Sequence, residues 1–215
     1  MQSSALFPPV AEFANDLLKG IAEKLSAERK ELLLQLVDYI HHQLQESGEV
    51  HLNFICTHNS RRSHISQIWA AAGAQHFKLS GVYTYSGGTE ATAFQPRAIA
   101  AMERAGFQIS TDHSEVENPV YSVRFSTIGE GTKAWSKRFD DAANPRENFA
   151  AIMTCSDADQ NCPWVPGTDK RIPLTFEDPK VADGTPAEAV RYDQAVREIG
   201  RELLWVMREV ALRPF

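Results

Sequence analysis

The chain has 215 residues, 43% hydrophobic and 23% charged, an ordinary composition for a globular protein with one substantial core. Its net charge of -6 argues against general affinity for nucleic acid, because binding phosphates needs an excess of Lys and Arg. The sequence shows no apolar run near the roughly 20 residues that span a bilayer, and no secretion-signal pattern at its start. An odd count of three cysteines favours reduced or catalytic thiols in the cytoplasm over a disulfide framework.

Residues 1–50 are predicted to form an N-terminal helical extension. Apolar residues recur at helical spacing in two runs, and Ser26 between them can cap a second helix that extends to about Glu46. The apolar face of this helical pair is wide. We therefore expect the pair to pack on the main domain or on a second subunit, the latter giving a homodimer.

A strand, a polar loop and a helix are predicted in the stretch that follows. Residues 51–55 form an apolar run typical of a buried strand, and a helical pattern begins at Ser63 and ends near Gly73. Backbone N–H groups at such a turn point into the loop, and together with the helix dipole they favour a bound anion. The stretch therefore predicts an oxyanion site.

Three side chains of this loop carry the chemistry. Cys56 stands at its mouth, where the same field favours a thiolate nucleophile. Arg62 can return its guanidinium to a tetrahedral oxyanion held over the sulfur, and Ser63 can donate a hydrogen bond to that sulfur. A buried free cysteine before a basic loop would explain either Cys56 or Arg62 alone, but it fits the combined Cys-x5-Arg-Ser pattern poorly.

The middle of the chain continues the α/β pattern and then departs from it. Residues 81–85 alternate as a second strand, and residues 96–104 form a helix. Residues 86–89 have the composition of a turn, with a loop that faces the site at the carboxyl end of the strand as the alternative. Residues 107–109 are expected to continue toward the sheet. Residues 111–146 are less regular and are predicted to insert a hairpin of two strands joined by a Gly-rich loop.

The C-terminal part supplies the remaining strands. Residues 149–154 read as a third buried strand, residues 170–176 as a fourth, and residues 186–212 as a long amphipathic helix. Strands that alternate with helices predict a four-stranded, parallel, doubly wound α/β sheet for residues 51–215, with its polar loops at the carboxyl edge of the strands.

Two more cysteines flank an acidic segment at that same edge. The separation between Cys155 and Cys162 lets the two sulfurs meet, or lets Cys155 reach Cys56, so thiolate exchange could pass a disulfide outward. A zinc site is one alternative, but neither a fourth cysteine nor a histidine has fitting spacing. Two unrelated buried thiols are another, for which an Asp-rich exposed loop is a poor place.

These motifs resemble those of a known family. Residues 56–63 look like the phosphate loop of the low-molecular-weight tyrosine phosphatase superfamily. Residues 155–162 are similar to the redox segment of its thioredoxin-coupled arsenate reductases, which ordinary tyrosine phosphatases lack. Asp178, whose alternative role is an exposed acid in a turn, lies in a segment that resembles the one carrying the family's general acid. The similarity covers residues 50–212, except for the insertion, and implies a low-molecular-weight phosphatase-like fold.

The resemblance implies a mechanism without a bound cofactor or metal. Cys56 would attack arsenate, Asp178 would protonate the departing oxygen, and Cys155 would then attack the adduct and release arsenite. Cys162 would next attack Cys155, and thioredoxin would reduce the resulting disulfide as the external reductant. The oxyanion, arsenate or phosphate, would be held by the loop residues Thr57, His58, Asn59, Ser60, Arg61, Arg62 and Ser63.

Four positions depart from the family pattern. His58 stands where the family usually has glycine, so we expect local strain if that position needs a positive φ, or a second proton donor. Arg61 replaces a smaller residue and is expected to face solvent. Gln67 replaces an acidic residue that holds a stabilising cation, which argues against cation dependence. His64 is expected on the surface.

Two other functions fit part of the same residues. A low-molecular-weight phosphatase acting on aryl or protein phosphotyrosine would need only Cys56, Arg62 and Asp178, through a phosphocysteine intermediate. A non-catalytic oxyanion-binding interaction protein would explain the altered His58 and Arg61, and would use the helical extension to assemble.

Overall fold

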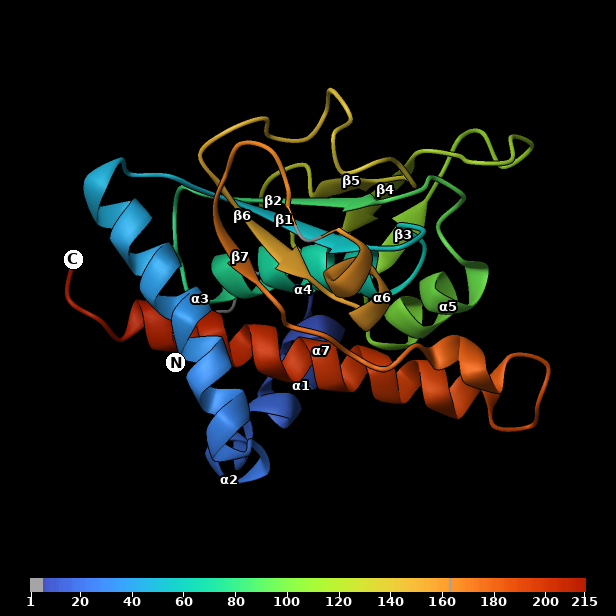
Figure 1. Cartoon of the computed structure of the whole chain (residues 1–215). Coiled ribbons are helices and arrows are strands. Elements are labelled where there is room, and N and C mark those ends of the chain that lie inside the picture. Colours follow the sequence, from blue (N-terminus) through green and yellow to red (C-terminus); the bar gives the residue numbers. More distant parts are fainter. Residues whose placement is uncertain (1–5, 163) are drawn as a thin grey trace.

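The computed structural model describes residues 6–162 and 164–215, and at its centre lies a four-stranded parallel sheet in the order β2-β1-β6-β7 (Figure 1). The predicted four-stranded, parallel α/β sheet is confirmed. Its strands are β1 (Val50–Cys56), β2 (Val82–Gly88), β6 (Phe149–Met153) and β7 (Thr168–Ile172). Because all four are parallel, their carboxyl ends and the loops that follow them meet at one edge.

Seven α-helices and one short 3-10 helix are found in residues 6–162 and 164–215. None of these helices is long and apolar enough to cross a membrane. The helices are α1 (Pro8–Leu18), α2 (Ile21–Lys24), α3 (Ala27–Glu46), α4 (Arg62–His76), α5 (Pro96–Arg104), α6 (Ser156–Asn161), η1 (Pro179–Ala182) and α7 (Glu188–Ala211).

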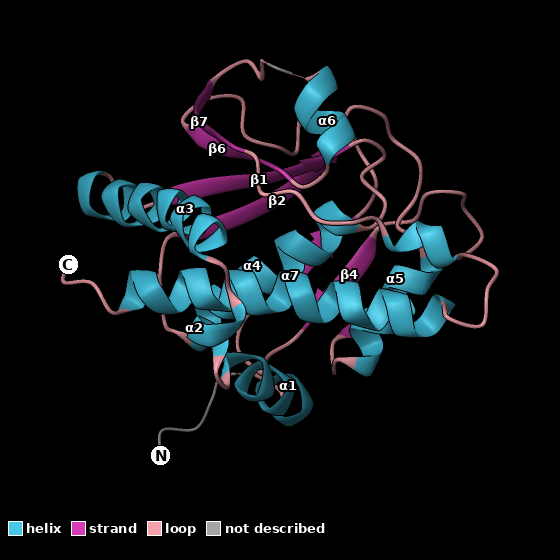
Figure 2. Ribbon diagram, turned by 60° about the horizontal axis from the view of Figure 1, so that its bottom comes forward, coloured by secondary structure: helices cyan, strands magenta, loops and turns pink. Residues whose placement is uncertain are grey.

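The two faces of the sheet are covered differently. Leu52 and Phe54 point from β1 into the main core, which α4 and α7 close on one side of the sheet (Figure 2). Ile55, on the other face, belongs to a smaller apolar cluster that includes α6 and Phe139 of the insertion. Burial on both faces explains why β1 reads as an apolar run and not as a clean alternation.

The N-terminal extension packs on the rest of the chain. Ser26 caps α3 as expected, because its hydroxyl accepts a hydrogen bond from the Arg29 N–H at 3.1 Å. Val10 of α1 and Leu36 of α3 lie in the same core as α4 and α7. The extension contains the additional short helix α2, and residues 1–5 lie outside the described residues. A homodimer through these helices stays a prediction.

The insertion forms a second, antiparallel sheet in the order β3-β4-β5. The predicted hairpin is confirmed as β4 (Tyr121–Arg124) and β5 (Thr132–Ala134). Residues 107–109 were expected to approach the main sheet, and this expectation is wrong. They lead into β3 (Gln108–Ser110), which pairs with β4 because that strand offers a free antiparallel edge.

Two predicted boundaries are also wrong. Residues 86–88 are the end of β2, not part of a turn. Helix α4 does not end at Gly73 but continues to His76. Gly73 marks a close approach of two helices, since an added Cβ would lie 3.1 Å from Met207 Cγ on α7. A glycine at a close contact between two helices was therefore mistaken for a helix stop.

Candidate active site

The phosphate loop, residues 56–63, joins the centre of the sheet to the helix behind it. Cys56 is the last residue of β1 and Arg62 the first of α4, and Cys56 is only 3% exposed. The end of β2 packs directly on the loop. A Cβ on Gly88 would lie 2.7 Å from the Asn59 nitrogen, so only glycine permits this approach.

Carbonyl groups of the loop point away from its centre. Those of Thr57 and Ser60 accept hydrogen bonds of 2.8 and 2.9 Å from backbone N–H groups within residues 89–95. In a trans peptide the following N–H points in the opposite direction, so the N–H groups of His58 and Arg61 face the other side. Such inward N–H groups form the concave donor surface that suits an anion.

A chain of hydrogen bonds leads to the sulfur of Cys56. The backbone N–H of Lys137 donates to Asn59 Oδ1 at 2.9 Å, which fixes the orientation of that amide. Asn59 Nδ2 then donates to Ser63 Oγ at 2.8 Å, which leaves the hydroxyl proton of Ser63 free. Ser63 Oγ lies 3.1 Å from Cys56 Sγ and can direct that proton to the sulfur.

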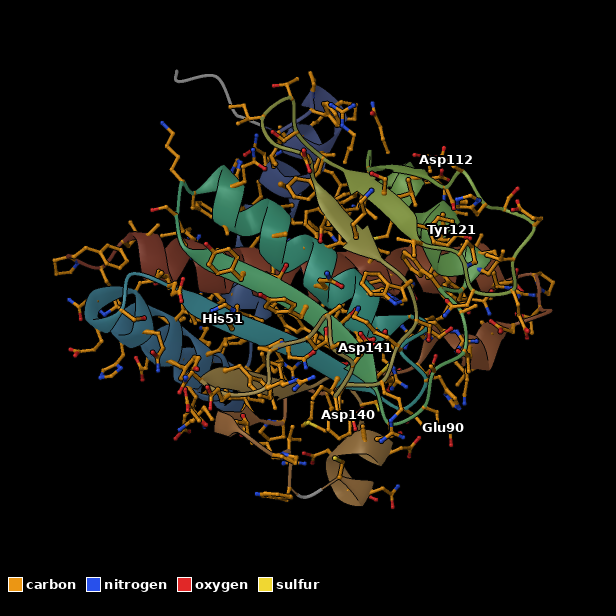
Figure 3. The ribbon with its side chains drawn as sticks, turned by 90° about the horizontal axis from the view of Figure 1, so that it is seen from above. His51, Glu90, Asp112, Tyr121, Asp140 and Asp141 are labelled. Atoms are coloured by element: carbon orange, nitrogen blue, oxygen red, sulfur yellow. The ribbon has the colours of Figure 1, made fainter. Side chains whose placement is uncertain are left out.

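The expected strain at His58 is wrong, because the left-handed residue of the loop is Asn59, with φ at 43°. Asparagine adopts this region more readily than most residues, and both ends of its side-chain amide are bonded here. The His58 imidazole lies 3.7 Å from the Glu90 carboxylate. Figure 3 shows Glu90 at the same end of the sheet as Asp140 and Asp141. A role of His58 in proton transfer stays a prediction.

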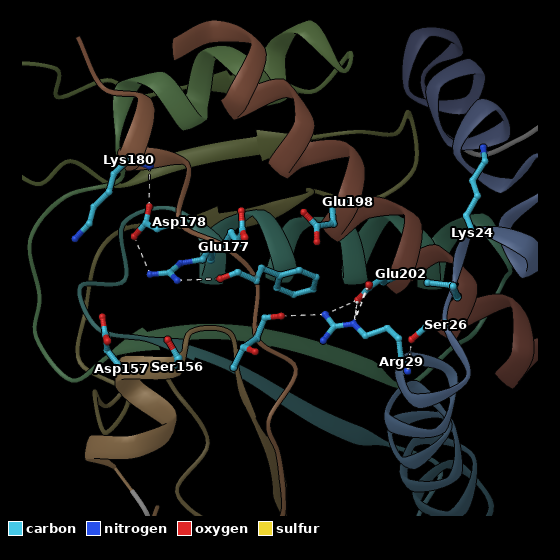
Figure 4. Close-up of a pocket in the computed structure, with 14 residues that line it drawn as sticks. Lys24, Ser26, Arg29, Ser156, Asp157, Glu177, Asp178, Lys180, Glu198 and Glu202 are labelled. Carbon is cyan, nitrogen blue, oxygen red and sulfur yellow. Dashed lines mark hydrogen bonds and ion pairs between the residues drawn. The ribbon is translucent and has the colours of Figure 1, made fainter. Parts of the chain in front are cut away.

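Arg62 faces the segment that carries Asp178, which we call the acid loop (residues 173–178). Arg62 Nη2 donates to Asp178 Oδ2 at 2.8 Å, and Nη1 donates to the Phe176 carbonyl at 3.0 Å (Figure 4). Asp178 is also fixed from its other side, since Oδ1 accepts the Lys180 N–H at 3.0 Å and so caps η1. Its carboxylate is 14% exposed, which does not fit the alternative of an exposed turn acid.

The site residues from the two loops line one small cavity. Its lining residues are Cys56, His58, Ser60, Arg61, Arg62 and Asp178. The structure thus brings together the predicted nucleophile, the predicted guanidinium and the predicted acid, which are up to 122 positions apart in the sequence (178 minus 56). This arrangement can hold a tetrahedral oxyanion between a sulfur and a proton donor.

The expectation that Arg61 faces solvent is wrong. Its Nε donates to the Tyr192 hydroxyl at 2.9 Å, and Nη2 lies 3.7 Å from Asp183. Tyr192 is fully buried, and burial is the main cause that raises its pKa to about 12. Its hydroxyl donates to Asp183 at 2.8 Å. Sequence reasoning gave Tyr192 no role, because no local pattern reports a contact with a residue 131 positions away.

His64 was expected on the surface and is fully buried instead. Its ring stacks on Phe94, with 4.2 Å between the ring centroids. Burial is the largest of the causes that lower its pKa to about 3, so the imidazole is neutral at physiological pH. His64 is therefore part of the packing between α4 and the segment before α5.

Cys155 lies beside the phosphate loop. Its sulfur is 3.4 Å from Thr57 Oγ1, and it shares one apolar cluster with Cys56 because β6 pairs directly with β1. An Asp-rich segment was expected to be a poor place for buried thiols. This expectation is wrong for Cys155, which is 0% exposed. The acidic segment is helix α6 and not a loop, and Cys155 caps it by accepting the Ala158 N–H at 3.3 Å.

Cys162 ends the same helix and is partly exposed. Its thiol donates to the Trp164 carbonyl at 3.6 Å. Burial raises the pKa of the Cys162 thiol, and the nearby Arg171 opposes that shift. Among residues 6–162 and 164–215, no three His, Cys, Asp or Glu side chains are grouped to hold a metal ion.

A buried cation lies next to the loop. The Lys137 side chain is almost fully buried, with Nζ 4.1 Å from the centroid of the Trp135 ring. Burial lowers the pKa of Lys137 from 10.5 to about 8. On α4, Gln67 Nε2 donates to the carbonyl oxygens of Thr84 and Lys133, so this position presents an amide donor.

Replacing Lys137 by methionine is expected to stabilise the fold most at neutral pH. There the lysine is charged in both states, and a shift of this size corresponds to a burial cost on the order of 3 kcal/mol. Between pH 8 and 10.5 the unfolded chain keeps a proton that the folded chain has released, so wild-type stability rises with pH across this window. Urea unfolding at several pH values measures the difference in unfolding free energy between Lys137→Met and wild type, with Lys133→Met as an exposed control. A difference that does not shrink toward pH 10.5 would contradict the expectation.

No family model matches the chain. An arsenate reductase from Bacillus licheniformis is 32% identical over 152 residues, which cover 70% of this chain and 89% of that protein. An arsenate reductase from Bacillus subtilis is 30% identical over 151 residues, with the same two coverages. The solved structure of a thioredoxin-dependent arsenate reductase from Corynebacterium glutamicum aligns with a TM-score of 0.41 and 20% identity over 93% of this chain and 96% of that chain. On the identity and coverage of the two Bacillus relatives, the chain belongs to the family of these arsenate reductases.

Proposed function

We propose that the protein reduces arsenate to arsenite with Cys56 as nucleophile, Cys155 and Cys162 as a disulfide relay, and thioredoxin as the external reductant. The observation that carries this proposal is the position of Cys155. Its sulfur lies 3.4 Å from the hydroxyl of Thr57, the residue after Cys56, and both cysteines belong to one apolar cluster. A second thiol beside the nucleophile serves disulfide formation, whereas phosphate hydrolysis does not require it.

In the first step the Cys56 thiolate attacks arsenic in arsenate. A sulfur–arsenic bond forms and the bond from arsenic to one of its hydroxyl groups breaks; that hydroxyl takes a proton from Asp178 and departs as water. Arg62 and the inward N–H groups of the phosphate loop stabilise the charge on the remaining oxygens. Arg62 exchanges its bond to Asp178 for the oxyanion, because one guanidinium edge can serve either partner.

In the second step Cys155 attacks the sulfur of Cys56. The sulfur–arsenic bond breaks, arsenic keeps its electron pair and leaves as arsenite, and a Cys56–Cys155 disulfide forms. Cys162 then attacks Cys155, which restores the Cys56 thiolate and yields a Cys155–Cys162 disulfide. Cys162 is the relay thiol that is partly exposed, which suits exchange with an external dithiol.

A phosphatase reaction is the second candidate, because Cys56, Arg62 and Asp178 line one cavity and this reaction would need no relay thiol. The deciding experiment is arsenate-dependent NADPH oxidation with thioredoxin and thioredoxin reductase. The proposal expects turnover that requires thioredoxin. Hydrolysis of aryl phosphate without any reduction of arsenate would rule out the reductase and leave the phosphatase function. A cytoplasmic location would keep the thiols reduced between turnovers.

A further inference from the structure

We propose that Arg29 of the N-terminal extension is a positioning residue for the acid loop, held in place by Glu202 of α7. This inference rests on the proposed function, because it assigns to the extension the task of placing Asp178. The extension would then be part of the catalytic unit, although it lies far from Cys56 in the sequence.

Arg29 contacts the acid loop in two ways. Its Nη2 donates to the Thr175 carbonyl at 3.1 Å, and its guanidinium lies over the ring of Phe176, 4.9 Å from the centroid. The carbonyl of that same Phe176 accepts from Arg62 at 3.0 Å, and Arg62 also bonds Asp178. Figure 4 shows the two ends of this path, Arg29 of the extension with Glu202, and Asp178.

Glu202 fixes the orientation of Arg29. Its two carboxylate oxygens accept from Arg29 Nε at 2.9 Å and from Nη2 at 2.7 Å, in a bidentate pair. Glu202 is 5% exposed, and burial raises the pKa of its carboxyl, which the bond to Arg29 opposes. A planar guanidinium can serve the carboxylate and the Thr175 carbonyl together, whereas a lysine ammonium cannot reproduce that geometry.

The pair stands in the wall of a cleft of about 640 Å³ that also reaches the predicted site. Arg62 and Asp178 line this cleft together with Arg29 and Glu202, and the acid loop runs along it. From the sheet, the loop is tied by the Phe176 N–H, which donates to the Thr154 carbonyl at 3.1 Å. Arg29 supplies a second hydrogen bond to the loop, from the side of the extension.

A small displacement of the acid loop is expected to slow the chemical step. Proton transfer needs the carboxyl within hydrogen-bond reach of the leaving oxygen, and a misplacement of about 1 Å can cost about 100-fold in rate. Loss of the Arg29 contacts with Thr175 and Phe176 should therefore lower the rate of arsenic reduction by about 10-fold to 100-fold, while Cys56 itself keeps its contacts.

The test variant replaces both partners, Arg29→Met with Glu202→Leu. Removing Arg29 alone would leave an uncompensated buried carboxylate and endanger folding, whereas replacing a buried pair by apolar residues is often neutral for stability. The matched control is Arg197→Met with Asp16→Leu. That ion pair also joins the extension to α7, and Arg197 also lies over a phenylalanine ring, at 5.0 Å, but it does not bond the acid loop.

The readout is the single-turnover rate of arsenite formation by the fully reduced full-length protein, in the wild-type and in the Asp178→Asn background. We expect the Arg29 and Glu202 double variant to be slowed by about 10-fold to 100-fold, and its control to stay within about 2-fold of wild type. In the Asp178→Asn background the double variant should add almost no further loss, because both changes then remove the same contribution. Alkylation of Cys56 by iodoacetamide should keep its rate.

Equal rates for the double variant and its control would overturn the inference, and so would a full additional loss in the Asp178→Asn background. Wild type without arsenate reduction would overturn the proposed function. The same cycle would then be measured with phenyl phosphate, whose leaving group also needs a proton from the acid. Absence of both activities in wild type would overturn both proposals.

Discussion

Replacing Cys162 by serine is expected to turn a multiple-turnover reductase into a protein that reduces one arsenate per chain. The first two steps need only Cys56 and Cys155, so arsenite still forms once and a Cys56–Cys155 disulfide remains. Without Cys162 this disulfide stays beneath the surface, because both of its cysteines are almost fully buried. Quantifying arsenite per chain, with and without thioredoxin, gives the result directly.

The other two cysteine variants should behave differently from that one. Cys56→Ser removes the nucleophile and should release no arsenite, whereas Cys155→Ser should stop at the sulfur–arsenic adduct. Counting free thiols provides the control, because one turnover of the wild type should leave one of its three thiols. Full steady-state activity in Cys162→Ser would refute the relay, and it would favour a mechanism in which another thiol resolves the adduct.

Replacing Asp178 by asparagine is expected to slow arsenic reduction by about 100-fold to 10,000-fold, the usual contribution of a general acid. Asparagine keeps the shape and can still accept a bond from Arg62, so binding of the oxyanion should change little. The single-turnover rate at saturating arsenate and the apparent affinity for arsenate separate these two effects.

Glu177→Gln is the matched control for that change. Glu177 is the neighbouring carboxylate of the acid loop, but its side chain is 84% exposed and pairs with Arg191 and not with Arg62. Its replacement should leave the rate within about 2-fold of wild type. A loss in Glu177→Gln as large as in Asp178→Asn would show that the loop and not the carboxyl matters.

What could be predicted from the sequence is what is encoded locally. Cys56, Arg62 and Ser63 lie within eight residues of one strand–loop–helix unit, so their meeting follows from the turn itself. The positive φ of Asn59 was not predicted. It is stabilised by two hydrogen bonds of the Asn59 side-chain amide, and one of them comes from a residue far along the chain, Lys137.

Contacts between distant segments could not be predicted. Arg61 reaches Tyr192 across 131 positions and Arg29 reaches Glu202 across 173, and neither pair has a spacing rule. The burial of Cys155 was missed for a related reason. An Asp-rich segment reads as an exposed loop, but α6 exposes Asp157, pairs Asp159 with Arg171 and turns its capping sulfur inward.

The proposed relay requires helix α6 to change shape when the protein is oxidised. Cys155 and Cys162 cap the opposite ends of this six-residue helix, and a difference of seven positions at the helical rise separates their backbones by about 10 Å along the axis. A disulfide tolerates no more than about 7 Å between the two Cα atoms, so joining these sulfurs requires the helix to uncoil. The oxidised chain, whose disulfide must take electrons from the reductant, would thus display a looped-out segment that the reduced chain hides. An external reductant could then distinguish the oxidised protein from the reduced one by the shape of this segment.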